Sequence, residues 1–194
     1  MQIVISRATD RYDLAHSYLE NHKATLHHYN ISHISTMSSS WKYNPNTYMV
    51  IAFCPDTSEM LGAVRLEISG DSDTIPMVRA IQSIGYNVSN FVENLADQGG
   101  LAELCGLWCK PGNAIKSLPK KLIQAALRCA EKIRVSQIVG FANKYSLPIV
   151  EGLGFTHVNS LENDGIFYYP TKKYKTYVVH YCKKKVESLT TKFG

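Results

Sequence analysis

The side chain best suited to acid–base chemistry in this 194-residue chain is Glu103. It lies in the apolar run 101–109, which is typical of a buried strand. A carboxylate half-buried in a strand can have its pKa raised towards neutrality, where it can accept a proton from a reacting group. Glu103 is therefore the candidate general base. The alternatives are a structural Glu on the exposed face of the strand and an ion pair with Arg65.

A basic loop, 115–121, follows this strand and leads into a helix. Free backbone N–H groups and the helix dipole attract anions at a helix N-terminus. Lys116, Lys120 and Lys121 add positive charge there. The pattern predicts a phosphate site, and the alternative is a set of solubilising lysines. Net charge is +5, so the partners considered are a phosphorylated cofactor, an acidic carrier protein and nucleic acid.

Other reactive side chains favour structural roles. Arg65 could hold a substrate carboxylate, but a salt bridge with Glu67 or Glu103 fits equally well. Cys105 and Cys109 are interpreted as small buried thiols. The tyrosines of 168–181 are interpreted as half-buried strands in preference to a nucleic-acid surface. The histidines lack the i, i+4 spacing that places two ligands on one helix face, so no metal is expected; they are His22, His27, His28 and His33.

Composition indicates a globular protein with a single domain over residues 1–194. Hydrophobic residues make up 45% and charged residues 19% of the chain. The apolar runs are strand-sized, so no membrane span is expected, and the N-terminal run is too short for a signal peptide. Five cysteines without a Cys-x-x-Cys pair argue against a disulfide framework. A cytoplasmic location is the simplest reading.

The periodicity predicts a mixed α/β fold. Strands are expected at 3–5, 47–54, 61–68, 101–109 and 137–142, with further β-formers at 166–169 and 174–181. A helix capped by Thr9 or Asp10 is expected over 11–29, and a loop or lid over 31–43. Region 77–96 is ambiguous, with a helix near 88–95. The strongest helix begins near Leu118, and Pro119 suits its first turn.

Two motifs resemble those of a known superfamily. Asn143-x-x-Ser146, followed by Gly154-Phe155, is similar to the segment that ends the acyl-carrier site of GCN5-related N-acyltransferases. The resemblance covers most of 3–155. It implies a mixed, mostly antiparallel central sheet flanked by helices. It also implies transfer of an acyl group from acetyl-CoA, another acyl-CoA or the phosphopantetheine of an acyl carrier protein to a small-molecule primary amine.

The chain departs from the common pattern of that superfamily at two places. The usual glycines of the phosphate loop are missing from 114–119, and Val150 occupies the position of the usual Tyr acid. Both departures also occur in the branch of autoinducer synthases and N-acyl amino acid synthases. Trp41, Arg65 and Glu103 resemble residues of that branch. Its Glu-Leu-Ser-Arg motif reads Glu-Leu-Cys-Gly here, with Gly106 in place of the Arg.

The resemblance implies roles for individual residues. Glu103 would be the base, with Tyr145 replacing the missing acid, and Trp41 and Arg65 would contact the acceptor. Trp108 fits a core aromatic as well as a pocket wall. The positions expected to bind the donor are Leu107, Trp108, Cys109, Ile115, Lys116, Ser117, Leu118, Lys120, Lys121, Asn143 and Ser146. A homodimer is one option in this fold. The competing hypothesis is a non-catalytic member that binds a carrier, a protein or nucleic acid.

Overall fold

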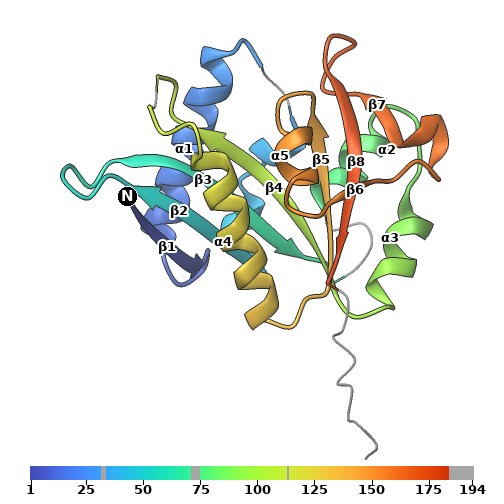
Figure 1. Cartoon of the computed structure of the whole chain (residues 1–194), viewed down its shortest axis with the longest axis horizontal. Coiled ribbons are helices and arrows are strands. Elements are labelled where there is room, and N and C mark those ends of the chain that lie inside the picture. Colours follow the sequence, from blue (N-terminus) through green and yellow to red (C-terminus); the bar gives the residue numbers. More distant parts are fainter. Residues whose placement is uncertain (32–33, 71–74, 113, 184–194) are drawn as a thin grey trace, which may run out of the picture.

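A computed structural model describes residues 1–31, 34–70, 75–112 and 114–183. These residues form one eight-stranded sheet with helices on both faces (Figure 1). The sheet order is β1-β2-β3-β4-β5-β8-β6, and β7 also pairs with β8. The strands are β1 (Gln2–Arg7), β2 (Thr47–Phe53), β3 (Met60–Ile68), β4 (Leu101–Cys109), β5 (Gln137–Asn143), β6 (Thr156–His157), β7 (Ile166–Tyr168) and β8 (Lys175–Cys182).

All strand pairs are antiparallel except β4 with β5, which is parallel. The predicted mixed, mostly antiparallel sheet is thereby confirmed. The helices are α1 (Tyr12–His28), α2 (Pro76–Gln82), α3 (Ser89–Ala96), α4 (Leu118–Lys132) and α5 (Leu147–Glu151), with short 3-10 turns η1 (Ser35–Met37), η2 (Ser40–Tyr43) and η4 (Glu162–Gly165).

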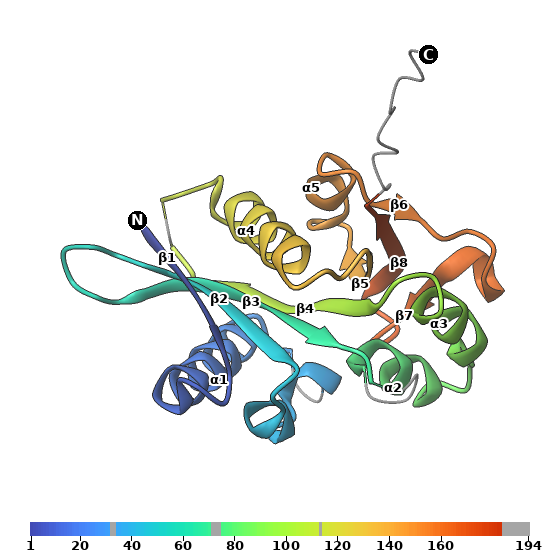
Figure 2. The same cartoon turned by 90° about the horizontal axis from the view of Figure 1, so that it is seen from below.

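The helices divide between the two faces of the sheet. Figure 2 shows α4 and α5 on one face and α1, α2 and α3 on the other. The predicted apolar stripe of α4 is confirmed, because Leu118, Leu122, Ala126 and Ala130 are buried against β2, β3 and β4. On the opposite face, Tyr18 of α1 and the β2 residue Met49 belong to a second core cluster.

Two irregularities open the middle of the sheet. Arg65 pairs with Cys105 and Ala63 pairs with Trp108, so two β4 residues oppose one β3 residue. This is a β-bulge, and Gly106 adopts φ +61° within it, a conformation that favours glycine. The parallel register of β4 with β5 covers only 101–104 with 137–140, although both strands continue beyond it. The two strands therefore stop pairing just before the bulge.

Three local predictions need correction. Helix α1 begins at Tyr12 without a side-chain cap, because its N-cap position is occupied by Arg11 and not by Thr9 or Asp10. Segment 31–43 contains η1 and η2 and buries Trp41, so its described part is not a plain loop. Helix α2 was missed because nearly all of it is buried, which removes the amphipathic period.

Two expected absences can be compared with the described residues. No helix in the described ranges has the length and apolarity needed to cross a membrane. Within those same ranges, no group of three or more His, Cys, Asp or Glu side chains could hold a metal ion. His33, one of the four histidines considered above, lies outside the described residues.

Candidate active site

A cavity of about 250 Å³ lies where β4 and β5 separate. Its walls come from both faces of the sheet. Residues 103–107 of β4 and 140–143 of β5 form the edges of the opening. Its other walls are largely apolar and include Leu26, Met77, Ile123, Val150 and Phe155. The cavity therefore passes between two strands and brings the bulge and Glu103 to one surface.

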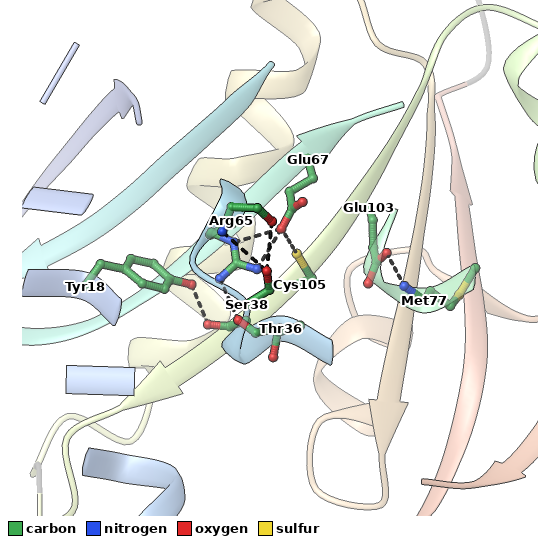
Figure 3. Close-up of polar contacts among 10 residues, drawn as sticks. Tyr18, Thr36, Ser38, Arg65, Glu67, Met77, Glu103 and Cys105 are labelled. Atoms are coloured by element: carbon green, nitrogen blue, oxygen red, sulfur yellow. Dashed lines mark hydrogen bonds and ion pairs between the residues drawn. The ribbon is translucent and has the colours of Figure 1, made fainter. Parts of the chain in front are cut away.

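Glu103 is the titratable carboxylate in this cavity. It is only 2% exposed, and its Oε2 accepts a 2.7 Å hydrogen bond from the Met77 N–H (Figure 3). Burial raises the pKa of Glu103 to about 8, and the nearby Glu67 adds to the rise. The Met77 N–H and the Arg65 cation act in the opposite direction. Glu103 is therefore neither on an exposed face nor hydrogen-bonded to Arg65, and its pKa suits a general base near neutral pH.

The Glu103–Met77 bond also positions α2. Met77 is the second residue of that helix, and the first, Pro76, has no N–H. The Glu103 oxygen therefore satisfies an N–H at the helix start, as a capping side chain would. The base is thus fixed by a helix that the sequence did not predict.

Arg65 is fully buried and forms an internal ion pair. Its Nε and Nη2 donate to Glu67 Oε1 at 3.0 and 2.6 Å, and its Nη1 donates to the Thr36 carbonyl at 3.3 Å. The guanidinium carbon lies 4.3 Å from the centre of the Trp41 ring. Of the two roles considered for Arg65, the structure contains the Glu67 salt bridge. Neither Arg65 nor Trp41 is among the residues that line the cavity.

Cys105 is buried, whereas Cys109 is half-buried. Cys105 Sγ donates to Glu67 Oε1 at 3.4 Å, and burial raises its pKa well above the ordinary value. Burial also raises the pKa of Cys109 to about 11. Both side chains therefore stay protonated near neutral pH and are poor nucleophiles. The interpretation as a buried thiol is thus confirmed for Cys105 and only partly met by Cys109.

Tyr18, on α1, contacts the bulge although it lies far from Gly106 in the sequence. Its hydroxyl donates to the Gly106 carbonyl at 2.5 Å. In a trans peptide the N–H points opposite to the C=O, so the Leu107 N–H is directed away from Tyr18. Leu107 lines the cavity, whereas Trp108 is 3% exposed and packs edge-on against Tyr18 as a core aromatic. Helical periodicity indicates that Tyr18 is buried but carries no information about its hydroxyl's partner.

The basic loop has a different character. Lys116, Lys120 and Lys121 are exposed. The Leu118 N–H donates to the Ile115 carbonyl at 2.9 Å, and Pro119 has no N–H to offer. The Lys121 N–H donates to the Ser117 carbonyl at 3.0 Å. The start of α4 therefore presents lysine cations more than backbone donors, and residues 115–121 lie outside the cavity lining.

Asn143 and Ser146 line the cavity at the end of β5. Asn143 Oδ1 accepts the N–H groups of Tyr145 at 2.9 Å and Ser146 at 3.1 Å, which forms the turn into α5. The Tyr145 side chain is 75% exposed and does not line the cavity. Val150, at the usual position of the acid, is buried and does line it. His22, Thr36 and Phe141 also line the cavity and were not selected from the sequence.

Comparison with known proteins finds likeness in structure only. No protein-family model matches the chain, and no curated protein matches it in sequence. Among solved structures, FeeM, an N-acyl amino acid synthase from uncultured soil microbes, is similar with a TM-score of 0.65 and 15% identity, over 91% of this chain and 93% of that one. An acyl-CoA N-acyltransferase from Pseudomonas aeruginosa has a TM-score of 0.62 and 12% identity, over 94% and 100%.

The fold is that of the GCN5-related N-acyltransferases. The expected fold is therefore confirmed, and acyl-homoserine lactone synthases are among the similar structures. One of these is BjaI, a CoA-dependent acyl-homoserine lactone synthase solved with SAM and isopentyl-CoA, at a TM-score of 0.58 and 14% identity, over 94% and 83%. At identities of this size the likeness is one of fold, and the chemistry must be argued from the site.

Proposed function

We propose that the protein is an N-acyltransferase that moves an acyl group from a pantetheine thioester to a primary amine. The observation that carries this proposal is the placing of Glu103 and the Gly106–Leu107 bulge in one cavity between diverging strands. Aminolysis of a thioester requires a base and a hydrogen-bond donor for the oxyanion. Glu103, with a pKa of about 8, supplies the base, and the Leu107 N–H, which is directed away from Tyr18, supplies the donor.

The reaction proceeds by direct attack. Glu103, or a water molecule next to it, accepts a proton from the substrate ammonium. The neutral nitrogen attacks the thioester carbonyl, and the Leu107 N–H donates to the oxyanion that forms. The carbon–sulfur bond then breaks, the attacking nitrogen loses its second proton as the amide forms, and the departing thiolate takes up that proton. Cys105 and Cys109 stay outside this sequence because their thiols remain protonated.

The donor is an acyl-CoA or an acyl carrier protein. Both carry pantetheine, which an unpaired strand edge at the β4–β5 opening can accommodate. Lys116, Lys120 and Lys121 would attract the CoA phosphates or the acidic surface of a carrier. The loop lacks the glycines that let a backbone approach a pyrophosphate closely, which favours the carrier protein. The acceptor is a small-molecule amine, and no metal takes part.

Thiol release tests the proposal. The protein is incubated with a panel of acyl-CoAs and acyl carrier proteins, with and without primary amines, and free thiol and acyl-amine are measured by mass spectrometry. Glu103→Gln keeps the shape of the side chain and removes the base, so turnover should fall by roughly 10²–10⁴-fold with donor binding retained. Failure of every pantetheine thioester to bind would sink the proposal.

Two observations favour a second candidate. Val150 occupies a cavity-lining position where the superfamily commonly has its Tyr acid, and the phosphate loop lacks its glycines. A module that has lost catalysis and binds a carrier, a protein or nucleic acid through its basic face would share these features. In that case donor binding would be seen without amine-dependent thiol release, and Glu103→Gln would change nothing.

A further inference from the structure

Tyr18 is a buried side chain that the reaction above does not use. It lies on α1, is 0% exposed, and its hydroxyl donates to the Gly106 carbonyl across a separation of 88 residues. We infer that Tyr18 is a positioning residue that fixes the bulge peptide and so aims the Leu107 N–H at the oxyanion. This inference rests on the proposed acyltransferase function.

The bulge needs an external restraint. Gly106 lacks a side chain and has φ +61°, so its own conformational preference holds the peptide only weakly. It also sits where two β4 residues oppose one β3 residue, so the regular ladder is interrupted there. The Tyr18 hydroxyl supplies a directional bond at this interruption. Since the peptide is planar, fixing the Gly106 carbonyl also fixes the Leu107 N–H.

Tyr18 itself is held on several sides. Its ring packs edge-on against Trp41 at 5.2 Å and Trp108 at 6.1 Å between ring centres. The Arg65 guanidinium lies 5.6 Å from the ring centre. Burial raises the pKa of the Tyr18 hydroxyl, so it remains a donor. The hydroxyl therefore has a fixed position and a fixed role as donor.

The packing explains why glycine occupies position 106. A Cβ there would lie 2.8 Å from the Tyr18 hydroxyl oxygen and 2.9 Å from Arg65 Nη1. These distances are too short for a carbon atom, so a larger residue at 106 would require Tyr18 and Arg65 to move. Tyr18, Arg65 and Gly106 thus form one mutually dependent unit behind the oxyanion site.

Tyr18→Phe tests the inference because it removes one oxygen and keeps the ring. An oxyanion donor acts in the transition state, so kcat should fall by roughly 10–100-fold with the donor KM within about twofold. The matched control is Tyr12→Phe, whose hydroxyl bonds to the Tyr43 hydroxyl at 2.8 Å on the surface, and it should leave both constants unchanged. A folded Tyr18→Phe protein with unaltered kcat, or a kcat loss matched by an equal loss of donor binding, would overturn the inference.

A second measurement separates this inference from the proposed function. The order parameter S² of the Leu107 N–H, measured by ¹⁵N relaxation, reports the mobility of the bulge peptide and requires no turnover. If the hydroxyl fixes this peptide, S² should fall from about 0.85 in Tyr12→Phe to below about 0.6 in Tyr18→Phe. An unchanged S² would overturn the positioning role. An inactive wild-type protein with the expected S² difference would instead count against the acyltransferase proposal alone.

Discussion

The bulge region and the basic loop present two different ways of building a site. At the bulge, Tyr18, Arg65 and Glu103 are buried and each donates or accepts a hydrogen bond within the fold. At the loop, Lys116 and Lys120 are exposed at the start of α4. Buried polar groups hold their geometry but depend on every partner, whereas exposed charges act over distance and are replaceable. Under the proposed function, chemistry belongs to the first region and attraction of the donor to the second.

The largest expected effect is on stability at the buried ion pair. Arg65→Met leaves Glu67, which is 5% exposed, without its cation. Removing one partner of a buried pair costs about 3–5 kcal/mol in the free energy of unfolding. The matched control is Lys110→Met, which breaks the exposed pair with Glu59 and should cost about 1 kcal/mol or less. Urea unfolding of both variants measures the difference, and equal losses would contradict the contrast between the regions.

The next effect is a pH dependence set by Glu103. Its pKa is about 8 in the folded protein against an ordinary value of 4.5. Between these values the folded protein keeps a proton that the unfolded chain releases, so stability falls as pH rises, by up to about 1.4 kcal/mol per pH unit from this group. Turnover should rise over the upper part of the same range as the base loses its proton.

Glu103→Gln is the control for that pH dependence. The substitution should remove the Glu103 contribution to the pH dependence of the free energy of unfolding, measured by urea unfolding at pH 5, 6.5 and 8. The pH dependence of kcat/KM in the wild-type protein completes the test. An identical stability profile in both proteins would show that Glu103 is not protonated in the fold.

A smaller effect is expected at the basic loop. Replacing Lys116, Lys120 and Lys121 together by Ala should raise the donor Kd roughly tenfold at low salt, because each exposed charge contributes a fraction of 1 kcal/mol. The effect should shrink as salt is added, and kcat should stay within about twofold. Lys132→Ala, at the other end of α4, is the control. A loss of kcat with donor binding intact would place the loop in the chemistry.

The smallest effect is expected at Tyr145. Its side chain is 75% exposed and lies outside the cavity lining, so Tyr145→Phe should change kcat by less than about twofold. Steady-state kinetics with saturating donor measures this. A tenfold loss would make Tyr145 the acid that the resemblance implied, and would bring an exposed residue into the chemistry.

Local pattern was sufficient for much of the fold. The apolar period of α4 follows from burial of one helix face, whereas the apolar runs of β2, β3 and β4 follow from burial of both faces of the strand; neighbouring residues encode both patterns. The motif at Asn143 and Ser146 placed the end of β5 at the cavity, where both residues lie. Glu103 was selected because burial in a strand can raise the pKa of a carboxylate towards neutrality, and its burial follows from the apolar run 101–109.

Only the tertiary structure decided how the site is assembled. Strand register and bulges depend on pairing between distant segments, so no local sequence pattern predicts the Gly106 bulge. Arg65 and Trp41 were expected at the acceptor, but their stacking and the Glu67 ion pair place them behind the bulge. The sequence by itself determined the buried stripe of α4 and the apolar strands, because neighbouring residues encode them. The fold decided which buried polar groups meet, because hydrogen bonds such as Tyr18 to Gly106 join residues that only folding brings together.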